Sequence, residues 1–546
     1  MNADFASQSD QVIRYCTVTV TEPDIHDPSS DARRVALALA SQYGVYGVEI
    51  GLDILRILQS RLRKSAWTVQ IALNKTKVVI IQGPDPIITA GLAIDIGASS
   101  IELSINNLIN GDLIAQKSII NPLIRFGSDP ISRVAYGMTT ADGFAEMTAM
   151  LQSTINTSIG SLAEEAGLSP AQILDAVFVA DPVTHHVMLG LDASELGSAP
   201  YTQAVAEPSD IQAREVGLHL APGALVHALP LLGGHVGSDC LAAAYHCGVG
   251  QGDEVTLLVD LGTTTEIMLG SQGRLFAAAP PAGSALEGVQ LEAGRHAVPG
   301  ATRAIRIDPE TYEPRYQIIG SPYWSDEPEF AASVEALDVG GFCRAGLIDA
   351  LAELRLTGLM GRDGTIDPDK ADITSRVREE YRSSTYLVRQ AEPRIALTQH
   401  DVRSLQMAKA AVQASARILL KRHGGQKIDR IVLTGGSGVS MDPLRAAIVG
   451  LFPDCDPSTI SFVENAALLG AKSALLSRSA REGMARLARE TNVIETVLDP
   501  DFQAEQIGAM GIPHRSEAFP LLAKRVELSD NEPLARGRRE GRRSRA

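Results

Sequence analysis

Cysteine is scarce in this chain, with five residues among 546: Cys16, Cys240, Cys247, Cys343 and Cys455. No two of them lie within five residues of each other. This spacing excludes a local Cys-x-x-Cys zinc or redox motif and argues against a cysteine-ligated iron–sulfur cluster. It is also untypical of a disulfide scaffold. We therefore expect a cytoplasmic protein with no iron–sulfur cluster in this chain.

Long apolar runs and an excess of positive charge are also lacking. No stretch of about 18 apolar residues occurs, so we expect no membrane span. The first residues, MNADFASQSD, are polar and acidic, unlike a signal peptide. The net charge of −16 argues against a protein that binds nucleic-acid phosphates. We expect neither nucleic acid nor membrane among the partners, and the sequence leaves the oligomeric state open.

The sequence pattern divides the chain into four segments. Residues 1–11 are polar and expected to be a disordered N-terminus. Residues 12–86 combine alternating strands with helices expected at 32–42 and 52–63, which predicts a small α+β domain. Residues 87–525 alternate strands and helices as α/β proteins do. The last eleven residues contain six arginines, so 526–546 is expected to be a disordered basic tail.

The α/β segment contains an internal near-repeat. Residues 91–105 are GLAIDIGASSIELSI and residues 256–270 are TLLVDLGTTTEIMLG. Each is an apolar strand, then Asp-x-Gly with small residues, then a second strand. Asp95 and Asp260 lie 165 residues apart, a separation typical of duplicated domain halves. We therefore predict two halves, at about 87–250 and 251–525.

An Asp-x-Gly turn followed by hydroxyl residues suits a phosphate. The glycine lets the backbone approach closely, and successive N–H groups of the turn point at the phosphate oxygens. An aspartate at the strand end can hold Mg²⁺ through water, which makes Asp95 and Asp260 the candidate metal ligands. The candidate phosphate-binding residues are Gly97, Ser99, Ser100, Gly262, Thr263, Thr264 and Thr265. An ordinary turn explains one such motif alone, whereas two facing turns would clamp a polyphosphate.

A third element follows an amphipathic helix expected at 399–422, which the Thr398/Asp401 capping box begins. Here a buried strand runs into Gly435, Gly436, Ser437 and Gly438. Small residues at this point would let an adenine and ribose lie flat against the backbone. A plain glycine-rich strand-to-helix loop is the alternative interpretation.

These motifs together resemble the ATPase superfamily of actin, sugar kinases and heat-shock chaperones. More specifically, the chain is similar to the ATP-dependent reductive activators of corrinoid proteins. The segments that carry this similarity are NP at 121–122, GSDPISR at 127–133, HVMLGLD at 186–192, APY at 199–201, GHVGSD at 234–239, AGSALEG at 282–288, DF at 501–502 and IPH at 512–514.

The resemblance implies an α/β fold in which a duplicated actin-like (ribonuclease H-like) ATPase domain follows a small α+β domain. It implies ATP and Mg²⁺ as cofactors, and ATP-dependent reduction of Co(II) to Co(I) in a corrinoid protein or corrinoid-dependent methyltransferase. Asp95 and Asp260 would position Mg²⁺ and water, and Glu287 would orient or activate the attacking water. Glu287 could instead be a carboxylate favoured at a helix N-terminus. Members of this family typically carry a [2Fe–2S] ferredoxin domain or a cysteine-rich cluster domain, and this sequence shows neither, so we expect a separate ferredoxin or flavoprotein to supply electrons.

Two departures from the family pattern keep other functions open. Arg344, in GFCRAG at 341–346, replaces a glycine and could either add a phosphate contact or block the nucleotide site. Ala98 removes a hydroxyl from the first turn, which predicts weaker binding there. The alternatives are a small-molecule kinase of the same superfamily and an ATP-gated protein-binding module without a redox role.

Spacing alone gives two further expectations about charged side chains. Asp129 and Arg133, four residues apart, are expected to form a helical ion pair, with a contact at a domain interface as the alternative. Gln406 and Lys409 are expected on a solvated face of the long helix.

Overall fold

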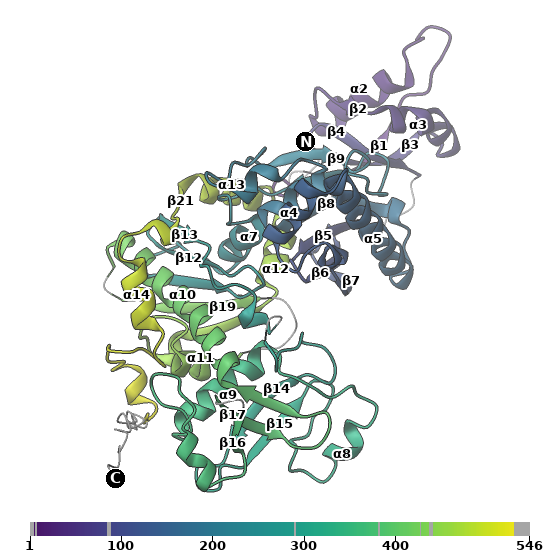
Figure 1. Ribbon diagram of the computed structural model, residues 1–546. Helices are drawn as coiled ribbons and strands as arrows, with labels where there is room; N and C mark the ends of the chain where they lie inside the picture. The colour runs from purple at the N-terminus through teal and green to yellow at the C-terminus, as the bar shows by residue number, and fades with distance from the viewer. Residues whose placement is uncertain are drawn as a thin grey trace, which may run out of the picture.

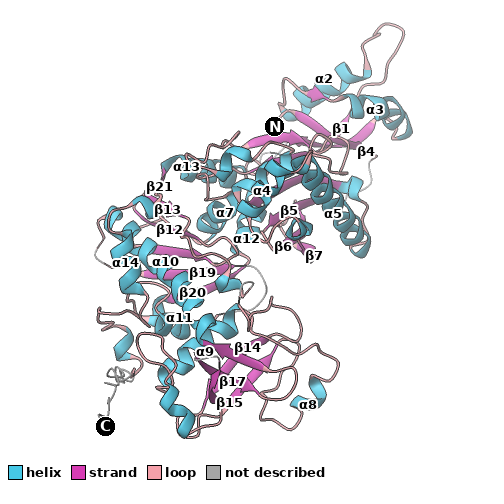
Figure 2. Cartoon of the chain, viewed as in Figure 1, coloured by secondary structure: helices cyan, strands magenta, loops and turns pink. Residues whose placement is uncertain are grey.

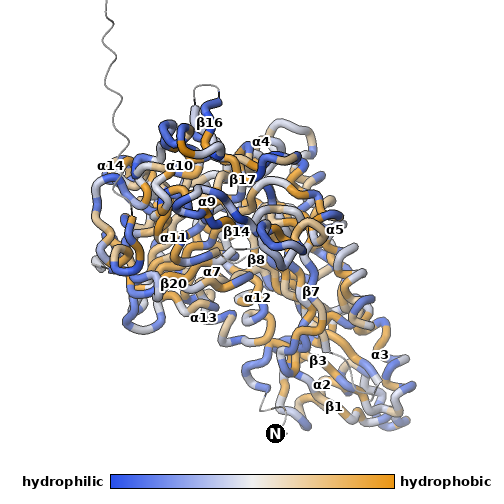
Figure 3. The backbone as a smooth tube through the Cα atoms, turned by 90° about the horizontal axis from the view of Figure 1, so that it is seen from below, coloured by the Kyte–Doolittle hydropathy of each residue, from blue (hydrophilic) through white to orange (hydrophobic). Residues whose placement is uncertain are grey.

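The computed structural model describes residues 5, 8–83, 89–288, 291–380, 383–425, 427–435 and 441–528. The described part is mixed α/β, with a small sheet near the N-terminus, two six-stranded sheets, and two small sheets in an insertion (Figures 1 and 2). Hydrophobic stretches run through the interior and hydrophilic ones lie toward the edges (Figure 3). None of the described helices is both long and apolar enough to cross a bilayer.

The N-terminal sheet has the strand order β1-β3-β4-β2. Its elements are β1 (Ile13–Thr19), α2 (Asp31–Tyr43), β2 (Glu49–Ile50), α3 (Leu52–Lys64), β3 (Thr68–Asn74) and β4 (Lys77–Gln82). Ser30 caps α2 by accepting a hydrogen bond from the Arg33 N–H, and Gly44 ends the helix in the left-handed conformation. Leu39 of α2 and Leu58 of α3 share a buried core with the strands. Helices therefore form where the sequence predicts them.

The first six-stranded sheet has the order β7-β6-β5-β8-β10-β9. Its strands are β5 (Ala90–Ile96), β6 (Ser100–Asn107), β7 (Leu113–Ile120), β8 (Ile173–Ala180), β9 (Ser209–Gln212) and β10 (Leu225–Ala228). Its helices are α4 (Pro130–Thr139), α5 (Gly143–Glu165), α6 (Pro182–Leu189) and α7 (Ser238–His246), with short 3₁₀ turns at Pro122–Arg125, Pro170–Gln172 and Ser194–Gly197.

The second six-stranded sheet has the order β20-β19-β11-β12-β13-β21. Its strands are β11 (Thr256–Asp260), β12 (Glu266–Ser271), β13 (Arg274–Ala278), β19 (Arg430–Gly435), β20 (Ile460–Glu464) and β21 (Thr491–Val493). Its helices are α10 (Gln399–His423), α11 (Pro443–Val449), α12 (Ala466–Leu476), α13 (Arg478–Glu490) and α14 (Phe502–Ala509), with 3₁₀ turns at Ala285–Glu287, Pro457–Thr459, Thr496–Leu498 and Leu522–Lys524.

An insertion between β13 and α10 projects away from both large sheets (Figure 1). It contains β14 (Thr302–Ile307), β15 (Pro314–Ile318), α8 (Phe330–Ser333), α9 (Arg344–Leu356), a 3₁₀ turn at Pro368–Asp372, β16 (Val377–Glu380), β17 (Ser383–Arg389) and β18 (Ile395–Thr398). Thr398 and Asp401 form the predicted capping box at the start of α10, and Gly424 ends that helix.

Strand pairing confirms the duplication that the near-repeat predicts. In the first sheet β5 pairs antiparallel with β6, and β6 with β7, while β8 lies parallel to β5 and β10 parallel to β8. In the second sheet β11, β12, β13, β19 and β20 repeat this arrangement in the same directions. The common order places the two Asp-x-Gly turns at equivalent edges of their sheets.

Helices α7 and α12 join the two halves through small residues. A Cβ on Gly470 of α12 would lie 2.1 Å from the Ala242 carbonyl oxygen of α7, so only glycine permits this approach. Ala243 and Ala471 are fully buried in the same core. Helix α12 also packs on β5 and β8 of the first sheet. A helix that lies in sequence between β20 and β21 of the second sheet therefore also belongs to the core of the first.

The expected solvated face of α10 is wrong, because Gln406 and Lys409 are fully buried. The Lys409 ammonium donates hydrogen bonds to the backbone carbonyls of Gly511 (2.5 Å) and Pro513 (2.7 Å). Gln406 donates to the Met510 carbonyl at 2.6 Å. Both side chains fix the segment after α14, and burial holds the pKa of Lys409 well below its usual value.

The expected N-terminal disorder does not extend over residues 8–11. The Asp10 carboxylate accepts hydrogen bonds from the Ser477 hydroxyl (2.7 Å) and the Ser479 N–H (2.9 Å) at the start of α13. A carboxylate at a helix N-terminus is favoured by the helix dipole. Of the predicted basic tail, residues 529–546 lie outside the described part.

A buried ionic network joins the N-terminal sheet to both halves of the larger body. Asp175 of β8 has no exposed side-chain surface and accepts hydrogen bonds from Arg481 of α13 (2.5 Å) and Asn74 of β3 (3.2 Å). Arg481 also contacts Asp210 of β9 at 3.3 Å, and Lys75 reaches the same carboxylate at 3.3 Å. Burial raises the pKa of Asp175 to about 6, although Arg481 acts in the opposite direction.

We expect Arg481→Met to destabilise this junction by about 3–5 kcal/mol, because it leaves the Asp175 carboxylate buried without its cation. The folded-state pKa of Asp175 is above its unfolded value of 3.8, and removing Arg481 raises it further. Stability linked to a raised pKa is lost as pH rises through that value. The destabilisation should therefore be larger at about pH 8 than at about pH 5.

Thermal melting across this pH range measures the effect, and hydrogen exchange in β8 locates it. Arg486→Met, an exposed arginine of the same helix, is the matched control. An R481M penalty that is equal at both pH values would contradict the assignment.

Candidate functional site

The two predicted metal-binding aspartates occupy equivalent positions on the duplicated hairpins. Asp95 of β5 pairs across the ladder with Glu102 of β6, and Asp260 of β11 pairs with Glu266 of β12. Both aspartates are partly exposed at the ends of otherwise buried strands, whereas both glutamates are buried. The duplication therefore extends from the strands to the acidic pairs.

The two predicted phosphate turns face each other. The hydroxyls of Ser99 and Thr263 lie 2.9 Å apart, although the residues are 164 positions apart in sequence. Thr265 in the second turn has a buried hydroxyl with no hydrogen-bond partner. The structure thus brings together the residues 97–100 and 262–265 that the near-repeat singles out.

Two side chains hold the carbonyl groups of the first turn. The Asn121 amide donates to the Gly97 carbonyl at 2.8 Å, and the Asn121 N–H donates to the Ser99 carbonyl at 2.9 Å. The Arg133 guanidinium donates to the Ala98 carbonyl and to the Gly127 carbonyl. These hydrogen bonds fix the backbone of the turn through its carbonyl oxygens. The Ser99 hydroxyl remains directed at Thr263 of the opposite turn.

The expected Asp129–Arg133 ion pair is therefore wrong. Asp129 caps α4 by accepting from the Ser132 N–H at 2.9 Å, while Arg133 is fully buried against the first turn. A helix cap by aspartate and buried hydrogen bonds from arginine to carbonyls stabilise the fold more than a solvent-exposed ion pair on a helix would.

Arg344, at the first position of α9, lies against the second turn. Its guanidinium donates to the Leu261 carbonyl and forms a 2.5 Å ion pair with Glu287. A Cβ on Gly435, at the end of β19, would lie 2.8 Å from a guanidinium nitrogen of Arg344. Glu287 thus belongs to this site, and its part in activating water stays a prediction. Gly436, Ser437 and Gly438 lie outside the described residues.

Several carboxylates crowded together in this cleft raise one another's pKa. Burial, Asp239 and Asp260 raise the pKa of Asp95 well above its usual value. Burial and Asp260 raise the pKa of Asp239 to about 7, and burial with Asp239 raises that of Glu266. Burial raises the pKa of Asp260 to about 6 against the opposing charge of Arg344. The cluster therefore favours a cation.

A magnesium nucleotide fits these residues. Within the described residues no three or more His, Cys, Asp and Glu side chains are grouped to hold a metal by themselves. Mg²⁺ commonly takes one or two carboxylates and completes its shell with water and substrate phosphates. The acidic cluster supplies the carboxylates, and the unpartnered Thr265 hydroxyl and the two glycine turns suit phosphate oxygens.

Sequence reasoning missed Asp181, Asp239 and Glu266. Asp239 stands in the quoted GHVGSD segment, and Glu266 stands in the quoted near-repeat opposite Asp260. Asp181 caps α6 with one oxygen, and its other oxygen is buried without a partner. Glu102 and Glu266 differ by one position in the aligned repeats, so only the strand register, which places each opposite an aspartate, reveals that they correspond.

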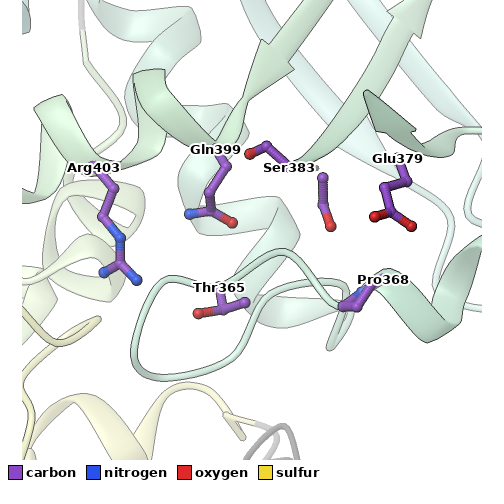
Figure 4. Close-up of a pocket in the computed structure, with 7 residues that line it drawn as sticks. Thr365, Pro368, Glu379, Ser383, Gln399 and Arg403 are labelled. Atoms are coloured by element: carbon purple, nitrogen blue, oxygen red, sulfur yellow. The ribbon is translucent and has the colours of Figure 1, made fainter. Parts of the chain in front are cut away.

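A separate polar pocket of about 280 Å³ lies in the insertion (Figure 4). Gln399 and Arg403 of α10 face it from one side, and Glu379 and Ser383 from β16 and β17 on the other. None of the predicted site residues lines it, so the pocket is not the candidate site.

Three family models match the chain in consecutive order: the RACo linker region over residues 6–85, the RACo middle region over residues 90–252, and the C-terminal domain of RACo, the ASKHA domain, over residues 254–523. A corrinoid activation enzyme RamQ from Eubacterium limosum is 29% identical over 424 residues, covering 76% of this chain and 68% of that protein. The solved structure of a reductive activator for a corrinoid, iron–sulfur protein superposes with a TM-score of 0.80 and 29% identity, covering 92% of this chain and 80% of that one.

We expect Asn121→Ala to weaken nucleotide binding by about tenfold, because loss of one buried hydrogen bond to the Gly97 carbonyl loosens the turn. Calorimetric titration with ATP and Mg²⁺ measures the change. Asn110→Ala, which removes an exposed amide on the β6–β7 turn, should leave the affinity unchanged. Equal affinities for wild type and N121A would show that the turn does not depend on Asn121.

Proposed function

The chain belongs to the RACo family, and from this premise we propose that it uses ATP to restore a corrinoid protein from inactive Co(II) to Co(I). The observation that carries this proposal is the pair of facing phosphate turns, joined by the 2.9 Å contact between Ser99 and Thr263. Each turn follows an aspartate at a strand end, and the two halves that supply them are packed together through α7 and α12.

The residues of the cleft have distinct parts in this proposal. Asp95 and Asp260 hold Mg²⁺, and the turns at 97–100 and 262–265 bind phosphate oxygens through backbone N–H groups and hydroxyls. Glu287 orients the attacking water once its carboxylate leaves Arg344. Bound ATP supplies the free energy that an unfavourable one-electron reduction needs. Because both halves contribute to one phosphate site, binding and hydrolysis of ATP would move the two halves relative to each other.

The cobalt of the corrinoid is the substrate, and it accepts one electron. The described residues include five scattered cysteines and no disulfide. The proposal therefore assigns the electron to a separate ferredoxin or flavoprotein, and the corrinoid protein or corrinoid-dependent methyltransferase is the second partner. The reaction is placed in the cytoplasm, where thiols stay reduced.

We expect purified chain, mixed with a Co(II) corrinoid protein and a reduced ferredoxin, to produce Co(I) only when ATP and Mg²⁺ are present. Asp260→Asn should lower the rate by at least about 100-fold, because it removes a charge that positions the metal. The absorbance change from Co(II) to Co(I) measures the reaction, and circular dichroism checks the fold.

Asp253→Asn is the matched control, since Asp253 is exposed and lies seven positions before Asp260. It should retain the full rate. Co(I) formation at the same rate with and without ATP would overturn the proposal.

A further inference from the structure

Arg344 is a buried cation whose position the proposed reaction leaves unexplained. Its side chain is 7% exposed, and it projects from the first residue of the 13-residue helix α9. It contacts three separate elements: the carbonyl of Leu261 before the second turn, the carboxylate of Glu287, and the backbone of Gly435. The buried cations Arg133 and Lys409 bind backbone carbonyls, whereas Arg344 also forms an ion pair with Glu287, a carboxylate of the candidate site.

Arg344 lies next to two elements that are predicted to bind a nucleotide. Leu261 directly precedes the predicted phosphate turn at 262–265, and Gly435 begins the loop predicted to take adenosine. Asp260 and Thr434, at the ends of β11 and β19, are ladder partners, so these two elements are adjacent. The guanidinium therefore lies beside the second predicted phosphate turn and the end of β19.

The charge of the cleft also requires a cation here. Asp95, Asp239, Asp260 and Glu266 crowd the site, and a nucleotide brings further negative charge. The Arg344 guanidinium binds the carbonyl of Leu261, the residue that follows Asp260, so its positive charge lies close to this cluster. The positive end of α9 points the same way, because Arg344 is its first residue.

We propose that Arg344 is a ligand of the nucleotide's phosphate chain and that Glu287 is the counter-ion it exchanges for phosphate. This inference rests on the proposed function, and it decides between the two roles that the sequence leaves open for Arg344. A guanidinium binds phosphate through two parallel N–H bonds, so it can transfer from a carboxylate to a phosphate without losing its hydrogen bonds. Glu287 is released in the same exchange, which couples nucleotide binding to the carboxylate proposed to orient water.

Calorimetric titration of wild type, Arg344→Met and Arg344→Lys with ATP, ADP and adenosine tests the assignment. We expect R344M to weaken ADP and ATP binding by about tenfold or more and to leave adenosine binding within about twofold, because only the phosphates lose a charge-assisted bond. R344K should retain more of the affinity than R344M. Arg315→Met, an exposed arginine on β15 with a side chain 53% exposed, is the control and should bind all three ligands as wild type does.

The dependence of ADP affinity on ionic strength distinguishes a phosphate ligand from a purely structural residue. ADP affinity should fall less steeply with added salt in R344M than in wild type, because one charge contact is missing. Glu287→Gln should strengthen ADP binding, since it removes the competing carboxylate. Thermal melting identifies any variant that has lost its fold, and R344K then replaces R344M in the comparison.

The outcomes separate this inference from the proposed function. If wild type binds ADP and R344M binds it equally or more tightly, Arg344 is not a phosphate ligand and the inference fails alone. Equal losses for adenosine and ADP would also overturn it, because they indicate a structural role. If wild type binds no nucleotide at all, the proposed function and the inference both fail.

Discussion

The close packing of helices α7 and α12 determines where the groups of the cleft lie. Gly470 permits α12 to approach the Ala242 carbonyl, and α12 in turn packs on β5 and β8. Helix α7 carries Asp239 in its first turn, so the same contact that joins the halves also delivers a carboxylate to the cleft. With β5 and β11 in equivalent positions, Asp95 and Asp260 then converge. Their mutual repulsion is a consequence of this packing, and a cation bound between them would relieve it.

Both predicted phosphate turns are fixed through backbone carbonyl groups in or directly before them. Asn121 and Arg133 bind the carbonyls of the first turn, and Arg344 binds the carbonyl that precedes the second. A peptide whose oxygen is fixed on one side has its N–H directed to the other. Side chains far from each other in sequence thus perform one task, which is to orient backbone donors before any anion arrives. Such preorganisation lowers the cost of binding, because fewer groups must be ordered by the ligand.

The parts of this architecture that the sequence predicts are those with local or periodic signals. The near-repeat around Asp95 and Asp260 gives the duplication, and the Thr398/Asp401 capping box gives the start of α10. Lys409 and Arg133 are different, because a lysine or arginine on a helix is usually solvated and no pattern shows that a carbonyl-rich segment will cover it. Those partners, at residues 98 and 511–513, are brought near by tertiary folding alone. Glu266 aligns with Ile101 in the repeat, so its correspondence to Glu102 appears only in the ladder register opposite Asp260.

The two turns are equivalent in topology and unequal in chemistry. The second turn has three threonines, the unpartnered hydroxyl of Thr265 and a nearby guanidinium, whereas the first has Ala98 and two serines. Since hydroxyls and a cation add to what backbone N–H groups provide, the second half offers more contacts to an anion than the first. The first turn is held by Asn121 and Arg133 and contacts the second through the hydroxyls of Ser99 and Thr263. The network around Asp175 and Arg481 in turn ties the first sheet to α13 and to the N-terminal sheet.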